Sequence, residues 1–169
     1  MARPIVRYRV LKTFAGTFAI LEGADGSLRT TWLDWGDPVD LAGAAEEKRL
    51  HRDLVERLRD YFAGEPADFG AWLPRGGSPF HRRCWDACQR IGWGSTVSYA
   101  DLAERAGSSR SGARAAGQAM RRNGLPVVVP CHRVIGSSGR LHGFAGSCDL
   151  DGPSLRLKAL LLAHERAHA

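Results

Sequence analysis

The sequence predicts an α+β fold, in which a small sheet with one helix is followed by a mainly helical half. Two observations lead to this expectation. The first half carries short apolar stretches separated by turn residues and then one long amphipathic segment, whereas the second half shows helical spacing and helix caps almost throughout. A chain of 169 residues suits one domain or two small ones, and we place the boundary between residues 1–77 and residues 78–169.

The first half is expected to contain three strands and one helix. The turn residues Asp25 and Gly26 help to delimit apolar stretches that predict strands over Val6–Leu11, Thr17–Leu21 and Leu28–Leu33. A helix is expected over residues 44–63, where apolar side chains recur at helical spacing: Leu50, Leu54, Leu58, Tyr61 and Phe62. Gly64 and Pro66 end this helix, and residues 67–77 are expected to form a linker. No chemical motif is recognisable in this half.

The second half opens with a capped helix that carries two of the four cysteines. Ser78 is an N-cap with a proline after it, and Gly92 follows the last apolar residue of a face formed by Phe80, Cys84, Cys88 and Ile91. The cysteines, at 84, 88, 131 and 148, include no CxxC pair, so neither a disulfide framework nor a zinc site is expected. Cys84 and Cys88 are interpreted as small core residues rather than metal ligands.

A helix-turn-helix is expected after this first helix. The sequence from Ser98 to Asp101 has the capping-box pattern that opens a short helix, and Gly107 closes it. A tight turn over residues 108–111 leads into a second helix over residues 112–122, which ends at Asn123. Two short helices joined by a tight turn are typical of DNA-binding helix-turn-helix units, although other helical hairpins share this spacing.

The second of these helices has few large side chains. Arg114 stands out among small residues, namely Ala113, Ala115, Ala116, Gly117 and Ala119. A helix that reads bases in the major groove needs several long polar side chains, whereas a bare helix lets the backbone approach closely, as entry into a narrow minor groove requires. The alternative is a helix packed tightly against the core, and the two interpretations are compatible if they apply to opposite faces.

The charge distribution points to nucleic acid. The net charge is +6; residues 1–77 carry 11 basic and 12 acidic residues (−1), whereas residues 78–169 carry 13 and 6 (+7). A one-sided basic excess is expected of a nucleic-acid-binding surface, and a general bias toward arginine does not explain the difference between the halves. No apolar run reaches the length of a membrane span, and the N-terminus does not resemble a signal peptide, so we expect a soluble cytoplasmic protein.

The segment that follows the second helix contains a candidate nucleophile. Residues 127–129 are β-branched and predict a short buried strand, which Pro130 ends, so that Cys131 lies where the chain leaves the core. A thiol attacks as thiolate and needs a base, for which His132 is adjacent if a turn or a bridging water connects the two. Glu165 falls on an apolar helical stripe, where a carboxylate needs a buried partner such as His132. The alternative for Cys131 is an inert buried cysteine.

Several of these stretches together resemble the O6-alkylguanine-DNA alkyltransferases. Residues 130–136, Pro-Cys-His-Arg-Val-Ile-Gly, resemble the active-site motif of that family. Residues 94–107 with Ser98-Tyr99 resemble its first helix-turn-helix element, and residues 113–123 resemble its recognition helix and the following loop. Residues 143–146 resemble its pocket loop and residues 160–165 its C-terminal helix. The resemblance covers about residues 78–166, while the first half matches only in size and element order.

The resemblance implies a role for each residue that carries it. Cys131 would accept the alkyl group, His132 would take its proton through water, Glu165 would hold His132, and Asn123 would brace the thiol's surroundings. Tyr99 would press on the phosphate 3′ to the target, and Arg114 would fill the gap left by the flipped base. The remaining implied contacts are with DNA, through Ala113, Ala115, Gly117 and Arg121, and with the base, through Tyr99, Val134, Phe144, Ala145 and Gly146.

The resemblance also implies the reaction and the partners. The protein would repair duplex DNA, bound through the minor groove, by a single-turnover transfer from O6-alkylguanine, and from O4-alkylthymine as a second candidate substrate. It would act as a monomer without cofactor or metal, and its first half would be a small ribonuclease-H-like α/β domain. Three departures bear on the details: phenylalanine replaces the usual tyrosine at Phe144, residues 147–153 are longer than expected, and one extra residue falls within residues 108–112.

Two other function classes remain open from the residues alone. A lesion sensor or a helix-turn-helix regulator would bind DNA without transferring anything, but sensors of this kind lack the acceptor cysteine that Cys131 supplies. A cysteine hydrolase would need an oxyanion hole and water access to an acyl intermediate. The sequence shows neither feature.

Overall fold

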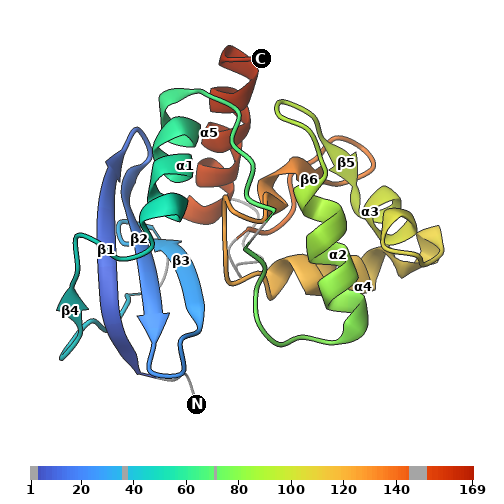
Figure 1. Ribbon diagram of the computed structural model, residues 1–169. Helices are drawn as coiled ribbons and strands as arrows, with labels where there is room; N and C mark the ends of the chain where they lie inside the picture. Colours follow the sequence, from blue (N-terminus) through green and yellow to red (C-terminus); the bar gives the residue numbers. More distant parts are fainter. Residues whose placement is uncertain (1–3, 36–37, 71, 145–151) are drawn as a thin grey trace.

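The computed structural model describes residues 4–35, 38–70, 72–144 and 152–169 and has the expected α+β composition. Figure 1 shows the sheet on one side, the helices α2 to α4 on the other, and α1 and α5 packed between them. One buried hydrophobic cluster includes residues of both halves, among them Phe18 and Leu58 from the first and Val128 and Leu161 from the second. The proposed boundary at residues 77 and 78 therefore crosses a shared core, and the division into two domains remains a prediction.

The three strands expected in the first half are confirmed. β1 (Ile5–Thr13) pairs antiparallel with β2 (Gly16–Gly23), and β2 pairs antiparallel with β3 (Leu28–Trp32). The sheet order is β3-β2-β1-β4, so the most apolar strand, β2, lies inside and is buried from Phe18 onward. This position matches the rule that a strand covered on both faces is a continuous apolar run rather than an alternation.

The helix of the first half begins later than expected. Residues 45–46 form the short strand β4 (Ala45–Glu46), which pairs in parallel with β1, and the amide of Glu47 donates to the carbonyl of Tyr8. His51 then takes a left-handed conformation (φ 45°), which no helix interior allows, and α1 runs over Arg52–Ala63. The predicted start at residue 44 was wrong because the backbone groups of these residues bond to a distant strand. The predicted end at Gly64 (φ 93°) is confirmed.

The capped helix of the second half forms as expected. The side chain of Ser78 accepts a hydrogen bond from the amide of His81 and opens α2 (Pro79–Gln89), which ends slightly before the predicted Gly92. Cys84 and Cys88 have no exposed surface, and the indole of Trp85 donates to the carbonyl of Ala119, which joins α2 to the later helix α4. The two cysteines thus pack as core residues. Residues 67–77, expected as a linker, are anchored to α2, since Gln89 donates to the carbonyls of Phe69 and Trp72.

The two short helices are present with their predicted caps. The strand β5 (Val97–Ser98) leads into α3 (Tyr99–Arg105), where Ser98 and Asp101 form the reciprocal capping box. Gly107 follows in a left-handed conformation, a single 3₁₀ turn η1 (Arg110–Gly112) makes the connection, and α4 covers Ala113–Arg121. In Figure 1 these helices lie beside α2 at the end of the molecule farthest from the sheet.

The predicted strand over residues 127–129 was wrong. Val127 has φ 72°, unusual for a β-branched residue, and the amide of Val129 donates to the carbonyl of Leu125, so these residues form a buried turn. The turn is held by Asn123, which accepts from the amide of Leu125 and donates to the carbonyl of Val129. Apolar β-branched residues predicted burial correctly, but the side chain of Asn123 provides the hydrogen bonds that a neighbouring strand would otherwise supply.

The reactive segment and the last helix complete the fold. The 3₁₀ turn η2 (Cys131–Arg133) leads into β6 (Val134–Ile135), which pairs in parallel with β5. The helix α5 (Pro153–Ala167) lies beside α1 in Figure 1, and the carbonyl of Tyr61 accepts a hydrogen bond from His164 at 2.9 Å. None of the helices in the described part of the chain is long and apolar enough to cross a membrane.

The capping box gives a direct test of how α3 is held. Ser98→Ala removes the side-chain acceptor of the Asp101 amide, so we expect a loss of about 1 kcal/mol in the free energy of unfolding, measured with urea. Ser109→Ala is the matched control, because Ser109 precedes the 3₁₀ turn without making a side-chain cap, and its effect should stay within about 0.5 kcal/mol. Equal losses in the two variants would contradict a specific capping role for Ser98.

Candidate functional site

Cys131 lies at the start of η2 and is almost fully buried, with 4% of its surface exposed. The turn that Asn123 shapes brings the amide of that side chain to 3.2 Å from the cysteine sulfur, to which it donates. One asparagine therefore holds the turn before the cysteine and contacts the thiol itself. The resemblance assigned Asn123 to the surroundings of the thiol, and its role in transfer remains a prediction.

The surroundings of Cys131 act on its pKa in opposite directions. Burial raises the pKa of the thiol, while the Asn123 amide, the positive charge of Lys158 and the backbone amides of Cys131 and His132 favour the thiolate. The net shift is upward, so the resting group is a thiol. The same donors are in place to stabilise the negative charge once a base removes the proton.

His132 and Glu165 meet behind the thiol. Both side chains have no exposed surface, and Nε2 of His132 lies 2.6 Å from Oε1 of Glu165. Cys131 and His132 are adjacent in the sequence, but in the 3₁₀ turn their side chains point in different directions. Cys131 contacts Asn123, whereas His132 contacts Glu165 on α5. Because an ionised carboxylate accepts only, Nε2 carries the proton in this arrangement, and the other ring nitrogen is left with its lone pair.

The second ring nitrogen of His132 is available for proton transfer. Nδ1 is buried and has no hydrogen-bond partner in the described part of the chain. Burial lowers the pKa of His132, although Glu165 acts to raise it, so the ring is neutral near pH 7. A neutral imidazole with one free lone pair is the form that accepts a proton.

Arg133 shares the Glu165 carboxylate with His132. Its Nε lies 2.9 Å from Oε2 and its terminal nitrogen 3.0 Å from Oε1, and the other terminal nitrogen donates to the carbonyl of Ile91 at 2.6 Å. The amide of Gly94 adds a further donor at 3.2 Å from Oε2. Burial alone would raise the pKa of Glu165, but the bonds from His132 and Arg133 lower it to about 2. The carboxylate is therefore ionised although it is buried.

Lys158 is a second buried charge on α5. It has no exposed surface, and its Nζ donates to the carbonyls of Val134 at 2.6 Å and His142 at 3.0 Å. Burial lowers the pKa of Lys158 to about 8, and the neighbouring thiols Cys131 and Cys88 act in the opposite direction. The ammonium group lies 5.8 Å from the centre of the Tyr99 ring. Lys158 therefore ties β6 to residues 142–143 and brings a positive charge near the thiol.

Sequence reasoning missed three members of this site. Lys158 lies seven positions before Glu165, two helical turns away on the same apolar stripe, and this second buried charge was a usable signal. Arg133 belongs to the cysteine motif, but nothing in the residue spacing predicted its ion pair with Glu165. Tyr61, whose hydroxyl donates to Glu165 at 3.0 Å, comes from the first half and carried no signal beyond its place on an apolar helical face.

The helix-turn-helix presents one bare face and one packed face. On α4, Arg114 and Ala115 are exposed and Ala113 and Gly117 half-buried, while Ala116 and Ala119 have no exposed surface. A Cβ atom on Gly117 would lie 3.8 Å from the Tyr99 ring, an ordinary contact distance, so Gly117 lies against Tyr99 without the packing requiring a glycine. The packed interpretation is confirmed for the face that carries Ala116 and Ala119, and contact of the other face with DNA remains a prediction. Arg121, at the end of α4, is also exposed.

The residues expected around the base surround Cys131 only in part. Tyr99 is half-buried and donates to the carbonyl of His142 at 3.2 Å. Val134 is fully buried, with its carbonyl bonded to Lys158, and Phe144 is buried with its ring 6.4 Å from that of His132. The expected pocket residues Ala145 and Gly146, like Cys148 and most of residues 147–153, lie outside the described residues.

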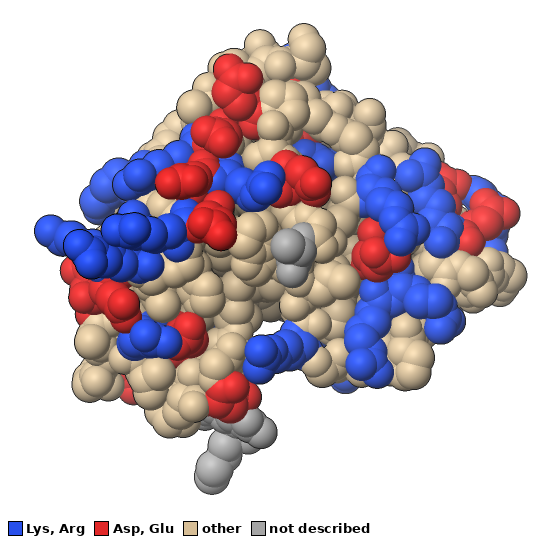
Figure 2. Space-filling model, in the orientation of Figure 1, with Lys and Arg blue, Asp and Glu red and all other residues tan. Residues whose placement is uncertain are grey.

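The surface over the helical half is rich in arginine. Figure 2 shows Lys and Arg side chains gathered over this half, with a second, more mixed group over the sheet side. The exposed arginines of the segment from α2 to the end of α4 are Arg82, Arg83, Arg90, Arg105, Arg110, Arg114, Arg121 and Arg122. Some of them are paired, for example Arg110 with Asp101 and Glu104. The positive excess found in the sequence is thus displayed around the helix-turn-helix.

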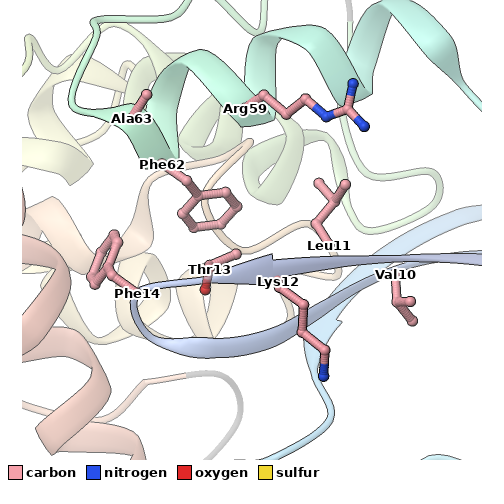
Figure 3. A pocket seen from close by; sticks show the side chains of 8 residues that line it. All are labelled: Val10, Leu11, Lys12, Thr13, Phe14, Arg59, Phe62 and Ala63. Atoms are coloured by element: carbon pink, nitrogen blue, oxygen red, sulfur yellow. The ribbon is translucent and has the colours of Figure 1, made fainter.

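Surface hollows elsewhere are distinct from this cluster. One lies between β1 and α1 and is lined by residues that include Lys12, Phe14 and Arg59 (Figure 3), none of which contacts Cys131, His132 or Glu165. A second is lined by residues that include Arg140, His142 and Arg156. Among the described residues, no group of three or more His, Cys, Asp or Glu side chains has the geometry of a metal site.

The fold and this cluster define a class: a helix-turn-helix protein that carries a buried cysteine backed by a histidine and an ionised carboxylate. Residues 79–167 match the family described as "6-O-methylguanine DNA methyltransferase, DNA binding domain". The chain belongs to this family of methylated-DNA–protein-cysteine methyltransferases.

Relatives extend the similarity well beyond the second half. The constitutive methylated-DNA–protein-cysteine methyltransferase of Bacillus subtilis is 39% identical over 94% of this chain and 94% of its own length. The corresponding protein of Mycolicibacterium paratuberculosis is 45% identical over 98% of this chain and 95% of its own. The first half, which in the sequence matched the family only by size and element order, is therefore part of the similarity.

Solved structures agree with this assignment. The crystal structure of Mycobacterium tuberculosis OGT in complex with DNA matches with a TM-score of 0.78 at 32% identity, covering 97% of this chain and 95% of that one. The Mycobacterium tuberculosis O6-methylguanine methyltransferase matches with a TM-score of 0.75 at 30% identity. The agreement includes the arrangement of the sheet relative to the helices, because nearly the whole chain is superposed.

The ion pair between Glu165 and Arg133 gives a prediction for stability and pH. Glu165→Gln leaves Arg133 as a buried charge without its partner, so we expect a loss of about 3–5 kcal/mol in the free energy of unfolding at pH 7, measured with urea. Because the pKa of Glu165 is lowered in the folded state, the unfolded chain binds more protons, and stability falls as the pH drops from about 4.5 to about 2.

The variant should lose that part of the acid sensitivity. Asp86→Asn, which removes an exposed carboxylate paired with Arg90, is the control and should leave both the stability at neutral pH and its dependence on acid close to native. A Glu165→Gln protein as stable as the native one, with the same acid dependence, would show that this carboxylate is not ionised in the folded state.

Proposed function

We propose that this chain repairs alkylated DNA by moving the alkyl group from O6 of guanine onto its own Cys131, once per molecule. The observation that carries the proposal is the buried thiol of Cys131 with His132 and the ionised Glu165 behind it, in the half that also bears the helix-turn-helix. Membership of the methyltransferase family supports the same reaction. O4-alkylthymine remains a second candidate substrate.

The contacts suggest a route by which the thiol proton is transferred. The thiol proton of Cys131 passes to Nδ1 of His132, through a water, because the two side chains diverge and Nδ1 has no other partner in the described residues. Glu165, on the opposite ring nitrogen, stabilises the imidazolium that results. The thiolate is meanwhile stabilised by the Asn123 amide, by Lys158 and by the backbone amides of η2.

The chemical step is an in-line displacement at the alkyl carbon. A bond forms between that carbon and Sγ of Cys131, the bond to O6 of guanine breaks, and the guanine that leaves takes up one proton. The thioether is stable, so no step regenerates the thiol and each molecule reacts once. No cofactor is needed, because the nucleophile, the base and the charge stabilisation all come from side chains and backbone of this chain.

DNA would be bound through the bare face of α4. Its small residues Ala113, Ala115 and Gly117 would allow close approach of the backbone in the minor groove, and the exposed Arg114 would fill the stack from which the target nucleotide is expelled. Tyr99, on the adjoining helix, would press on the phosphate 3′ to that nucleotide, and Arg121 would add a contact at the end of α4. We propose that a single copy of the chain suffices.

The base pocket would lie between Tyr99 and the segment from Val134 to Gly146. Lys158 donates to the carbonyls of Val134 and His142 and so joins two parts of this segment. Phe144 offers no hydroxyl to the base, so one hydrogen bond that a tyrosine would supply is replaced by an apolar contact. A cytoplasmic location, expected from the sequence, remains a prediction.

The geometry of the site supports two other functions less well. A sensor or regulator without transfer gives no reason for a braced thiol with a histidine and carboxylate behind it. A cysteine hydrolase needs free amides near the nucleophile, whereas the amide of Cys131 donates to the carbonyl of Val129 and that of Arg133 to the carbonyl of Pro130.

One experiment separates these functions. The protein is incubated with duplex DNA that carries O6-methylguanine with a labelled methyl group, and the label is followed. Stoichiometric label on the protein, mapped by mass spectrometry to the peptide that contains Cys131, supports transfer. Label that stays on DNA bound to the protein supports a sensor, and multiple turnovers support a hydrolase.

Replacing the nucleophile should abolish transfer without removing DNA binding. Cys131→Ser keeps the size of the side chain but supplies a far weaker nucleophile at neutral pH, so we expect no detectable label on the protein. Cys84→Ser, a change in a buried cysteine on α2 outside the cysteine motif, serves as control and should still transfer. Stoichiometric transfer by the Cys131→Ser protein would refute the assignment of the acceptor.

Arg114→Ala should impair repair of duplex DNA more than reaction with the free base O6-benzylguanine. Extrusion of a nucleotide costs a few kcal/mol, which a gap-filling side chain offsets, whereas the free base needs no extrusion. Arg122→Ala removes an equally exposed charge just after α4 and should weaken duplex binding only through the general electrostatic attraction, an effect that added salt reduces. Equal losses on both substrates for Arg114→Ala would indicate a packing role.

A further inference from the structure

Tyr61 is a buried residue of the first half whose hydroxyl reaches the His132–Glu165 pair. It lies near the end of α1, is 1% exposed, and packs its ring against Phe62, Phe69 and Trp93. Its hydroxyl oxygen lies 3.0 Å from Oε1 of Glu165 and 3.3 Å from Nε2 of His132. A side chain from outside the motif-bearing half thus makes contact with both partners of the proposed relay.

The hydroxyl keeps its proton and donates it to the carboxylate. Burial and the negative charge of Glu165 raise the pKa of Tyr61, so the phenol stays neutral. Oε1 of Glu165 then accepts from Tyr61, from Arg133 and from Nε2 of His132. The lone pairs of the phenol oxygen face Nε2, where they favour a hydrogen on that nitrogen.

These contacts leave one self-consistent arrangement of protons. If His132 were protonated on Nδ1 instead, the lone pair of Nε2 would point at an ionised carboxylate oxygen 2.6 Å away and also at the phenol oxygen. That arrangement brings lone pairs together without a proton between them, which is unfavourable in a buried site. The hydrogen therefore lies on Nε2, and Nδ1 is the acceptor for the thiol proton.

We propose that Tyr61 is a positioning residue for alkyl transfer: its hydroxyl orients Glu165 and fixes the tautomer of His132 that can accept the proton of Cys131. The proposal rests on the proposed function, since the tautomer matters for transfer only if His132 is the base. It also gives the first half a part in the chemistry, through one hydroxyl that crosses from α1 to α5. Tyr61 would touch neither the thiol nor the alkylated guanine and would act through His132 and Glu165.

The test is Tyr61→Phe, which removes the hydroxyl and keeps the ring packing. We expect the transfer rate to fall roughly 10-fold, equally with methylated duplex and with O6-benzylguanine. The contact that is lost is with Glu165 and His132 and not with the DNA. Without the hydrogen bond from the phenol, the Glu165 carboxylate is a stronger acceptor for the proton on His132, so the pKa of His132 rises. Protonated His132 cannot accept the thiol proton, and the loss of transfer rate in acid should therefore begin at a higher pH.

A matched control separates positioning from packing. Phe69→Leu loosens the ring cluster around Tyr61 but leaves the hydroxyl in place, so it should lower stability while keeping the pH profile of transfer native. Binding of Tyr61→Phe to undamaged DNA, followed by fluorescence anisotropy, should match the native protein. A native rate with an unchanged pH profile in Tyr61→Phe would overturn the proposal.

The tautomer is also measurable without any transfer. Side-chain nitrogen NMR of the native protein should show His132 neutral and protonated at Nε2, and the spectrum of Tyr61→Phe should show a higher pKa for this ring. A native His132 protonated at Nδ1 would overturn the positioning role whatever the activity. Conversely, the expected spectra in a protein that transfers no label would leave the contact of Tyr61 with the His132–Glu165 pair and the tautomer assignment intact, and would refute the proposed function.

Discussion

The buried, ionised carboxylate of Glu165 is the interaction on which the rest of the structure depends. A carboxylate without solvent is very costly unless its oxygens are fully bonded, and this requirement recruits donors from three separate parts of the chain. Tyr61 comes from α1, Gly94 from the segment between α2 and β5, and His132 and Arg133 from η2. The first half, the helix-turn-helix half and the cysteine motif are thereby fixed to the same helix, α5. The shared core across the expected domain boundary follows from this arrangement as much as from hydrophobic burial.

The charges around the thiol explain how it remains protonated at rest yet is ready to react. Arg133 neutralises much of the charge of Glu165, so the carboxylate does not hold an imidazolium permanently, and burial keeps His132 neutral. Lys158 and Asn123 favour the thiolate but do not outweigh the burial of Cys131. A permanent thiolate would be open to oxidation, which matters for a molecule that reacts only once. A resting thiol with a base behind it and donors around it avoids that loss and still ionises when the substrate is in place.

Local patterns predicted the elements of this fold well, and contacts between distant segments explain where they failed. The caps at Ser78 and Ser98, the strands of the first half and the two short helices follow from residues within a few positions of one another. The helix start at residue 44 and the strand over residues 127–129 were wrong because β1 and the side chain of Asn123 bond the backbone there. In the site, the pairing of His132 with Glu165 could be inferred from a charge on an apolar stripe. The hydroxyl of Tyr61 and the partner of Arg133 could not, because only the tertiary structure brings them to that charge.

Two buried charged residues of α5 link the proposed proton relay of His132 and Glu165 to the surface that would bind DNA. Lys158 and Glu165 lie seven residues apart, which on a helix is about 10 Å along one face. Glu165 holds the proposed proton acceptor His132, while Lys158 donates to the carbonyl of Val134, just after η2, and to the carbonyl of His142, which also accepts from Tyr99. A displacement of Tyr99 by bound DNA would therefore act on the same carbonyl that Lys158 holds, and Lys158 is the charge that favours the thiolate. One helix with two buried charges thus connects Tyr99, through the carbonyl of His142, to the surroundings of Cys131.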